Sequence, residues 1–283
     1  MDLIYQIKAF ILGIVEGLTE FLPISSTGHL IIAGDLLNFT GPEVNTFNIA
    51  IQAGAIFAVC WFYRQRLWQV ATGLFTQKKE QRLAINLIVA FLPAAILGVI
   101  FADLIEELLF NAISVAVALV LGGFIIFWVE NAHAKRNYSP RVPNMDDMTA
   151  KDAFLVGCMQ CIAMIPGTSR SGATIIGGLV LGLSRKAATE FSFFLAIPTI
   201  FGATVYSLAK TFLRVSEQQT FVWTTDMTVG FIVGFVVSFV SALVVVKWLL
   251  RYVSSNDFKS FGWYRIIFGI IILVTYYTGL VAW

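Results

Sequence analysis

The stretch from Glu16 to Leu30 concentrates side chains that could carry out chemistry within an otherwise apolar sequence. It reads Glu-Gly-Leu-Thr-Glu-Phe-Leu-Pro-Ile-Ser-Ser-Thr-Gly-His-Leu, and apolar runs lie on both sides of it. An ionisable group at bilayer depth costs about 2.5–3.5 kcal/mol, so a cluster of such groups indicates a functional site.

Glu16 and Glu20 are four residues apart, and a helix would place them on one face. Two carboxylates at this spacing repel each other unless a cation or proton lies between them. Mg²⁺ and Ca²⁺ take oxygen ligands of this kind, so the pair is a candidate metal site. The alternative is a pair of partly solvated carboxylates at a helix end.

Ser25, Ser26, Thr27 and His29 follow the second glutamate. Ser26 is a candidate nucleophile, and His29, three residues later, is a candidate base. Each hydroxyl alone could instead cap a half-helix, and His29 could be a buried histidine with satisfied hydrogen bonds. The combination of these groups in one buried place favours the functional interpretation.

A second polar stretch, Gly167-Thr-Ser-Arg-Ser-Gly172, precedes an apolar helical run. An arginine, hydroxyls and free amides at a helix N-terminus suit an anion, and phosphate best. The alternative is a capping loop whose Arg170 extends to the membrane interface. The stretch lacks the Gly-Lys-Ser/Thr of a P-loop, so nucleotide use is not indicated.

The composition predicts an all-α polytopic membrane protein. Of 283 residues, 58% are hydrophobic and 13% are charged, whereas a soluble domain carries roughly a quarter charged residues. The apolar runs are continuous and about 17–20 residues long, which favours helices over a barrel. A net charge of +2, without a basic stripe, argues against nucleic acid as a partner.

The pattern predicts about six transmembrane helices plus two re-entrant helix-loop-helix segments. Segment 7–37 is too polar at its centre for an ordinary span, and Pro23 and Gly28 disfavour a continuous helix. Segment 153–183 resembles it. The predicted spans are 47–62, 85–101, 113–129, 191–208, 229–246 and 263–280.

The two halves match when the chain is shifted by 144 residues: Gly13 falls on Gly157, and Ser25 on Ser169. Repeat 1 covers about 1–130, a cytoplasmic loop 131–151, and repeat 2 about 152–283.

Three spans, an odd number, would separate the re-entrant segments, so the repeats are expected to be inverted and their segments to meet near the midplane. The basic loops then lie on the cytoplasmic side, and the site opens to the periplasmic or outer face.

The motifs Glu16-x-x-x-Glu20, Pro23-Ile-Ser-Ser-Thr-Gly-His29 and Pro166-Gly-Thr-Ser-Arg-Ser-Gly-Ala-Thr174 resemble those of the bacterial undecaprenyl-diphosphate phosphatase family of the bacitracin-resistance type. The similarity covers the whole chain in length, span number and motif order. It implies hydrolysis of undecaprenyl diphosphate to undecaprenyl phosphate, the lipid carrier of cell-wall synthesis, in the bacterial inner membrane. It also implies bacitracin resistance.

The resemblance implies roles for residues at matching positions. Glu16 and Glu20 would bind a divalent cation or act in catalysis, Ser26 and His29 would be nucleophile or base, and Arg170 would hold the diphosphate. In the preferred hypothesis Ser26 attacks the terminal phosphorus and His29 takes its proton; in the competing one His29 or a glutamate activates water directly. The other expected diphosphate-binding residues are Ser169, Ser171, Thr174, Ser25 and Thr27.

A different class of function fits the same architecture. Secondary transporters also use inverted repeats with broken helices, and a carrier or flippase of a lipid phosphate would use Arg170 as its substrate clamp. The pair Ser26 and His29 favours the phosphatase, because a carrier has little need of a nucleophile and base. The expected partners are the polyprenyl diphosphate and the bilayer, and a homodimer is left open.

Overall fold

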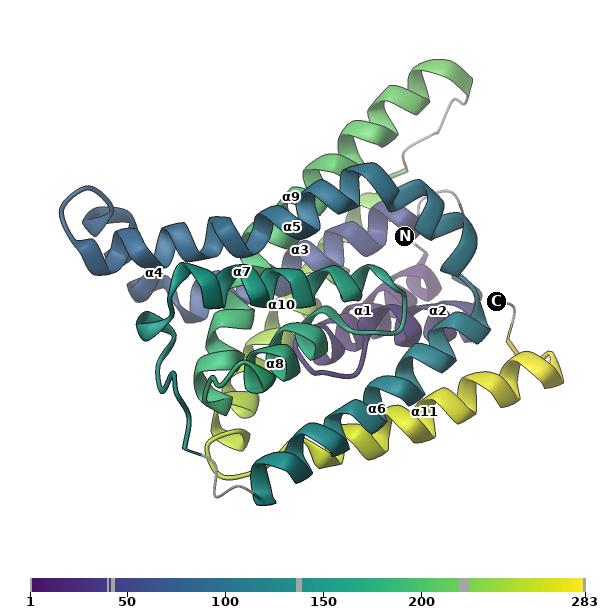
Figure 1. Cartoon of the computed structure of the whole chain (residues 1–283). Helices are drawn as coiled ribbons and strands as arrows, with labels where there is room; N and C mark the ends of the chain where they lie inside the picture. Colours follow the sequence, from purple (N-terminus) through teal and green to yellow (C-terminus); the bar gives the residue numbers. More distant parts are fainter. Residues whose placement is uncertain (1, 40, 42–43, 136–138, 219–223, 282–283) are drawn as a thin grey trace.

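The chain folds into a bundle of helices (Figure 1). The computed structural model describes residues 2–39, 41, 44–135, 139–218 and 224–281, and no strand is present in these residues apart from one isolated bridge between Val142 and Leu183. The α-helices are α1 (Leu3–Thr19), α2 (Ser26–Leu36), α3 (Val44–Phe62), α4 (Arg64–Gly73), α5 (Lys78–Leu109), α6 (Ala112–Lys135), α7 (Ala150–Cys161), α8 (Arg170–Val180), α9 (Arg185–Gln218), α10 (Thr225–Tyr252) and α11 (Lys259–Thr278), with short 3₁₀ turns η1 (Met145–Asp147) and η2 (Ile162–Met164).

Six of these helices are long and apolar enough to cross a membrane, which confirms the predicted all-α membrane class. They are α3, α5, α6, α9, α10 and α11, and each contains one of the six predicted spans or most of it. The α5 helix continues to Leu109, beyond the predicted end of its span at 101. Many large apolar side chains on these helices are exposed, for example Val99 and Ile232, as expected for surfaces that face lipid.

Both polar motifs interrupt helices where the sequence predicted a break. The α1 and α2 helices are joined by residues 20–25, and α7 and η2 are joined to α8 by residues 165–169. The α2 and α8 helices have 11 residues each and begin 144 positions apart. This local equivalence supports the internal repeat, whereas the re-entrant path and the inverted orientation stay predictions.

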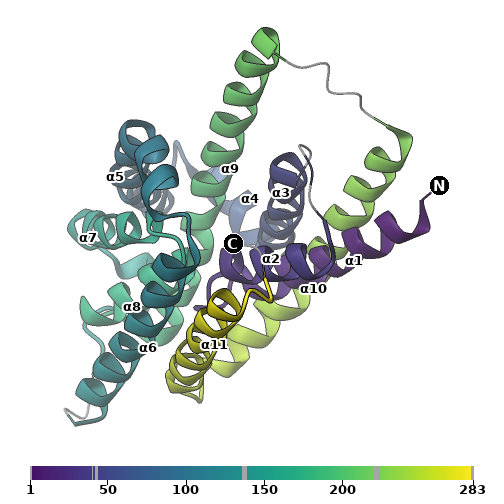
Figure 2. The ribbon, with the colours of Figure 1, turned by 90° about the vertical axis from the view of Figure 1, so that its right-hand side faces the viewer.

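Helices of the first half pack on helices of the second half. The α1 helix packs on α10 and α7 packs on α5, while α6 pairs with α11 (Figures 1 and 2). Gly13 of α1 lies against the backbone of Gly234, and Gly157 of α7 lies against the backbone of Ala90. These two contacts correspond under the shift of 144 residues, since Gly13 matches Gly157 and Ala90 matches Gly234. Such reciprocal contacts are what a two-fold axis between the halves produces.

We expect Gly157→Ala to destabilise the protein. A methyl group there would lie 2.8 Å from the Cα of Ala90, so the two helices would have to move apart, at a cost of about 1–3 kcal/mol. Gly98→Ala on α5 is the matched control, because nothing lies within 4 Å of its added methyl group. Thermal unfolding in detergent should show a lower midpoint for Gly157→Ala only, and equal midpoints for the two variants would contradict this packing.

Ion pairs join the first turns of α4 and α5 to η1, in the connection between α6 and α7. Arg66 donates to Glu80 at 2.6 Å and to Asp146 at 2.7 Å, and Lys79 lies 3.0 Å from Asp146. Burial opposes the charged form of Asp146, but the hydrogen bonds and charges of Lys79 and Arg66 prevail and lower its pKa. Asp146 therefore anchors the connection between α6 and α7 to α4 and α5.

Candidate active site

Two strained serines open the helices that carry the motifs. Ser25 has φ 72° and Ser169 has φ 71°, and both precede the first residue of a helix. A non-glycine residue in this left-handed region costs about 1–3 kcal/mol, and such residues cluster at functional sites. The Ser169 hydroxyl caps α8 by accepting from the amide of Gly172 at 3.1 Å, whereas Ser25 makes no side-chain cap on α2. The N-terminus of α2 is therefore suited to an anionic ligand.

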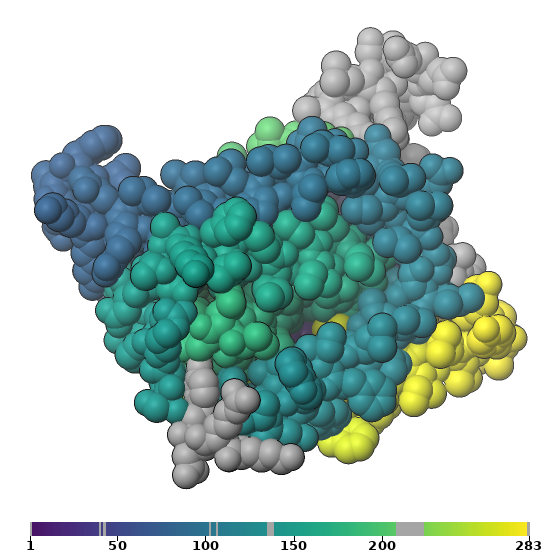
Figure 3. Space-filling model, viewed as in Figure 1, coloured from purple at the N-terminus to yellow at the C-terminus, as the bar shows by residue number. Residues whose placement is uncertain are grey.

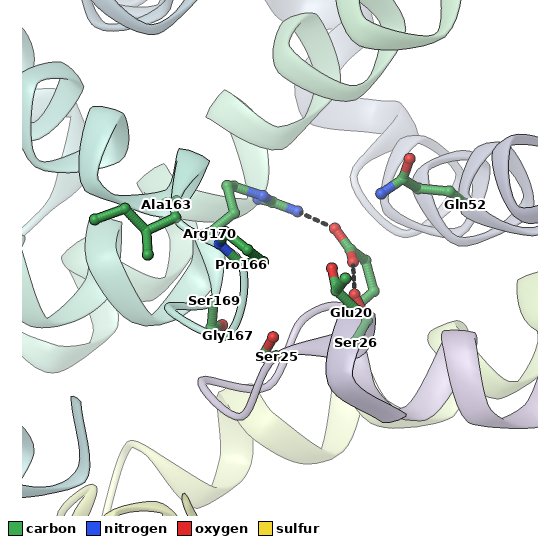
Figure 4. Close-up of a pocket in the computed structure, with 11 residues that line it drawn as sticks. Glu20, Ser25, Ser26, Gln52, Ala163, Pro166, Gly167, Ser169 and Arg170 are labelled. Carbon is green, nitrogen blue, oxygen red and sulfur yellow. Dashed lines mark hydrogen bonds and ion pairs between the residues drawn. The ribbon is translucent and has the colours of Figure 1, made fainter. Parts of the chain in front are cut away.

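A polar pocket of about 180 Å³ lies between the two motif loops (Figure 4). This volume suits a polar headgroup, because a complete drug-sized ligand needs about 300–1,000 Å³. The view of Figure 3 shows a hollow at the centre of one face, through which the N-terminal part of the chain is visible. Six of the predicted site residues line the pocket: Glu20, Ser25, Ser26, Thr27, Ser169 and Arg170.

Glu20 connects the two motifs at the centre of the pocket. Its Oε2 accepts a hydrogen bond from the Ser26 hydroxyl at 2.6 Å, and its Oε1 pairs with Nη2 of Arg170 at 2.9 Å (Figure 4). The carboxylate is 7% exposed and the arginine side chain 13% exposed, so water screens the pair weakly. A hydroxyl, a carboxylate that can take its proton and a guanidinium are thus held together.

Arg170 is oriented by contacts with two other segments, α9 and the first motif loop. Its Nη1 donates to the carbonyl of Ser192 on α9 at 3.1 Å, and its guanidinium lies 5.8 Å from the ring centroid of Phe21. Its buried Nε has no hydrogen-bond partner among the described residues. A buried donor without a partner is costly, and an anion in the pocket would satisfy it.

Ser171 and Thr174 are placed behind the pocket rather than in its lining, contrary to their expected contact with the ligand. Ser171 donates to the carbonyl of Leu22 at 2.8 Å, and Thr174 shares a hydrogen bond of 2.6 Å with the Ser192 hydroxyl. Both are 1% exposed or less. These hydroxyls join the second motif to the first loop and to α9, so they support the site without touching the pocket.

His29 is also outside the pocket lining, and the structure does not pair it with Ser26. Its Nδ1 lies 2.7 Å from the carbonyl oxygen of Ser25, and its Nε2 lies 2.6 Å from the hydroxyl of Tyr264 on α11. The ring stacks on Phe268, with centroids 4.0 Å apart. Both ring nitrogens are therefore engaged away from the Ser26 hydroxyl, whose hydrogen-bond acceptor is Glu20.

Glu16 fits a cation site better than a solvated helix end. It is 1% exposed, and neither of its carboxylate oxygens has a hydrogen-bond partner among the described residues. It interacts electrostatically with Glu20 and Arg170. The described residues contain no group of three acidic, histidine or cysteine side chains placed to hold a metal. The burial of Glu16 therefore argues against a solvated helix end, and whether Glu16 and Glu20 bind a cation stays a prediction.

Several residues of the site escaped the sequence analysis. Gln52 of α3 lines the pocket opposite Arg170 (Figure 4), Ser192 orients that arginine, and Tyr264 holds His29. Arg265 of α11 is 1% exposed and contacts both motif loops. Gln52 and Arg265 could have been identified from the sequence, because polar and charged residues inside predicted spans are functional candidates by default.

Comparisons with known proteins agree with the resemblance. A family model described as "Bacitracin resistance protein BacA" matches residues 9–271. A protein of Janthinobacterium sp. (strain Marseille) named undecaprenyl-diphosphatase is 55% identical over 283 residues, covering 100% of this chain and 99% of that one. A protein of the same name from Pseudomonas fluorescens (strain Pf-5) is 56% identical, covering 100% and 98%.

Proposed function

Because the chain belongs to the bacitracin resistance protein BacA family, we propose that Glu20, Ser26 and Arg170 form the centre of its active site. The activity is hydrolysis of undecaprenyl diphosphate to undecaprenyl phosphate and phosphate. The observation that carries the residue assignment is the hydrogen bond from Ser26 to a carboxylate that also pairs with Arg170.

In the first step the Ser26 oxygen attacks the terminal phosphorus of the substrate. The serine proton moves to Oε2 of Glu20, which already accepts it in a hydrogen bond of 2.6 Å. The bond between phosphorus and the bridging oxygen breaks, and undecaprenyl phosphate leaves with that oxygen. Arg170 donates to the terminal phosphoryl oxygens as their charge is redistributed, which is the main demand of phosphoryl transfer.

In the second step water attacks the phosphoserine. The phosphorus–oxygen bond to Ser26 breaks, Glu20 returns its proton to the serine oxygen, and inorganic phosphate is released. The proton of the water leaves with the released phosphate. His29, the base expected from the sequence, is bound to the Ser25 carbonyl and to Tyr264 outside the pocket lining, so it would have to give up one of these contacts to act in this step. This assignment differs from the sequence-based hypothesis in giving the serine proton to Glu20.

A divalent cation, Mg²⁺ or Ca²⁺, would be held by Glu16 and Glu20. When bound, it supplies positive charge to the diphosphate oxygens, as metal ions do in phosphoryl transfer. The support is the burial of Glu16, which is 1% exposed and whose two carboxylate oxygens accept no hydrogen bond from the described residues.

We expect Glu16→Gln to lower the apparent affinity for the cation by at least about 10- to 100-fold, because loss of a mere outer-shell partner of a metal ligand already has an effect of that size. A titration of phosphate release with Mg²⁺ or Ca²⁺ after chelation measures this, and Gln160→Glu, at the equivalent position of the second repeat, is the control. Activity that survives chelation in the wild type would exclude the cation site.

The substrate tail needs no enclosed channel. A polyprenyl chain is as apolar as lipid, so it can stay in the bilayer while the headgroup enters the pocket between the motif loops. The reciprocal contacts of Gly13 and Gly157 support two halves related by a two-fold axis, and the three long helices between the motifs support an inverted arrangement. With basic loops on the cytoplasmic side, the pocket would open to the periplasmic face of the inner membrane.

The packing of helices from one half on helices of the other also favours a second candidate function, a carrier or flippase of lipid phosphates, because secondary transporters are built from such repeats. Phosphate release from undecaprenyl diphosphate by purified protein in detergent separates the two, because no transport is possible there. Release by the wild type that is lost in Glu20→Gln supports the proposed site. Absence of release under varied metal and detergent conditions would instead favour transport.

A further inference from the structure

Arg265 is the most deeply buried cation of the described chain, and nothing in the proposed chemistry uses it. It lies on α11 and is 1% exposed. Its guanidinium has five N–H groups, and five backbone carbonyls accept from them. The acceptors are Pro23 at 3.0 Å, Thr168 at 2.8 Å, Gly167 at 3.0 Å, Ala118 at 3.1 Å and Leu119 at 3.3 Å.

These acceptors belong to three separate segments. Pro23 lies in the first motif loop, three residues before Ser26, while Gly167 and Thr168 lie in the second motif loop, directly before Ser169 and Arg170. The remaining two carbonyls belong to α6. One guanidinium thus links the loop that carries the serine to the loop that carries the catalytic arginine.

Loop carbonyls at membrane depth need such a donor. Backbone that leaves the helical pattern there is stable only where protein or water satisfies its polar groups. Arg265 satisfies three carbonyls of the two loops at once. A lysine would keep the charge, but its single nitrogen has only three donors, so it would leave at least two of the five carbonyls without their hydrogen bond.

The neighbouring helix leaves room for this side chain. A methyl group added at Gly122 of α6 would collide with the guanidinium of Arg265, and its nearest contacts are all atoms of that group. At the adjacent Gly123 an added methyl would meet the carbonyl of Gly262 and the side chain of Ile266, both 2.7 Å away, rather than Arg265.

We propose that Arg265 is a positioning residue that fixes the distance between the two motif loops, and thereby the placement of Ser26 against Arg170. It acts through the loop backbones and does not touch the substrate. This inference rests on the proposed roles of Glu20, Ser26 and Arg170.

The test compares Gly122→Ala with Gly123→Ala and adds Arg265→Lys, all purified in detergent. For each variant, thermal unfolding gives the folded fraction, and phosphate release from a long-chain prenyl diphosphate gives kcat and KM. We expect folded Gly122→Ala and Arg265→Lys to lose about 100-fold in kcat, the size of effect that a shift of roughly 1 Å in the reacting groups produces. KM should change only a few-fold, because Arg170 still binds the headgroup.

Gly123→Ala should keep kcat within about threefold of the wild type, although it disturbs the same helix pair. A folded Gly122→Ala with wild-type kcat would overturn the proposal, and so would equal losses in the two glycine variants, since helix packing would then explain both. If Arg265→Lys does not fold, Gly122→Ala decides alone. An inactive wild type would instead refute the proposed function on which the inference rests.

Discussion

Ser26→Ala is expected to lower kcat by about 10⁴-fold or more, because it removes the nucleophile and leaves only binding and charge stabilisation to the enzyme. The hydroxyl lies 2.6 Å from Glu20 and lines the pocket. Its loss leaves the pair between Glu20 and Arg170 intact, so binding of the headgroup should change little. Phosphate release by purified protein, with KM measured separately from kcat, gives the result.

Thr27→Ala is the matched control for this experiment. Thr27 also lines the pocket and is the next residue of the same helix. Its removal deletes a neighbouring hydroxyl without touching the proposed proton transfer, and we expect a loss of about tenfold or less, as for one hydrogen bond to the substrate. A Ser26→Ala enzyme as active as Thr27→Ala would rule out Ser26 as the nucleophile.

Replacement of Arg170 is the second large effect. We expect Arg170→Ala to reduce kcat/KM by about 10³-fold or more, in the range of an arginine that stabilises transferring phosphoryl groups. Arg170→Lys should recover only part of this. The structure uses two different nitrogens of the guanidinium, one toward Glu20 and one toward the carbonyl of Ser192, and an ammonium cannot reproduce that fork.

Arg64→Ala is the control for the loss of one positive charge. Arg64 begins α4 and stacks on Trp61, and neither residue lines the pocket. Its kcat/KM should equal that of the wild type. If Arg170→Lys were fully active, the fork geometry would be irrelevant and only the charge at that position would matter.

The broken helices could be predicted because their causes are local. Pro23 and a cluster of hydroxyls in one apolar run are incompatible with an ordinary span, and the helix does end at Thr19 and restart at Ser26. Gly28, which the sequence also suggested as a breaker, lies inside α2. The shift of 144 residues also carried information about geometry, since Ser25 and Ser169 share nearly the same positive φ. The local motifs and the repeat also predicted that Glu20, Ser26 and Arg170 belong to one site.

The partners of His29, Ser171 and Thr174 could not be predicted in this way. Spacing shows which residues share a helix face, but it does not show which helix packs on that face. His29 contacts Tyr264, 235 positions away along the chain, and Ser171 meets a carbonyl 149 positions away. Those contacts depend on how α11 and the first loop are packed, which is a property of the whole fold.

Arg265 was missed for a different reason. It lies within the predicted span 263–280, where the first residue, Trp263, is typical of an ordinary interfacial anchor. The cost of burying a charge in a span was a signal available from the sequence. The sequence could not show which groups accept hydrogen bonds from Arg265. They are five backbone carbonyls from three segments, and every residue type has a backbone carbonyl.

The stereochemical course at phosphorus tests the central claim most directly. The substrate is a long-chain prenyl diphosphate whose terminal group is a thiophosphate made chiral with oxygen isotopes, and the configuration of the released thiophosphate is determined. Attack by Ser26 followed by attack of water gives two in-line displacements, so the account predicts retention of configuration. Inversion would show a single displacement by water and would contradict the role of Ser26 as nucleophile.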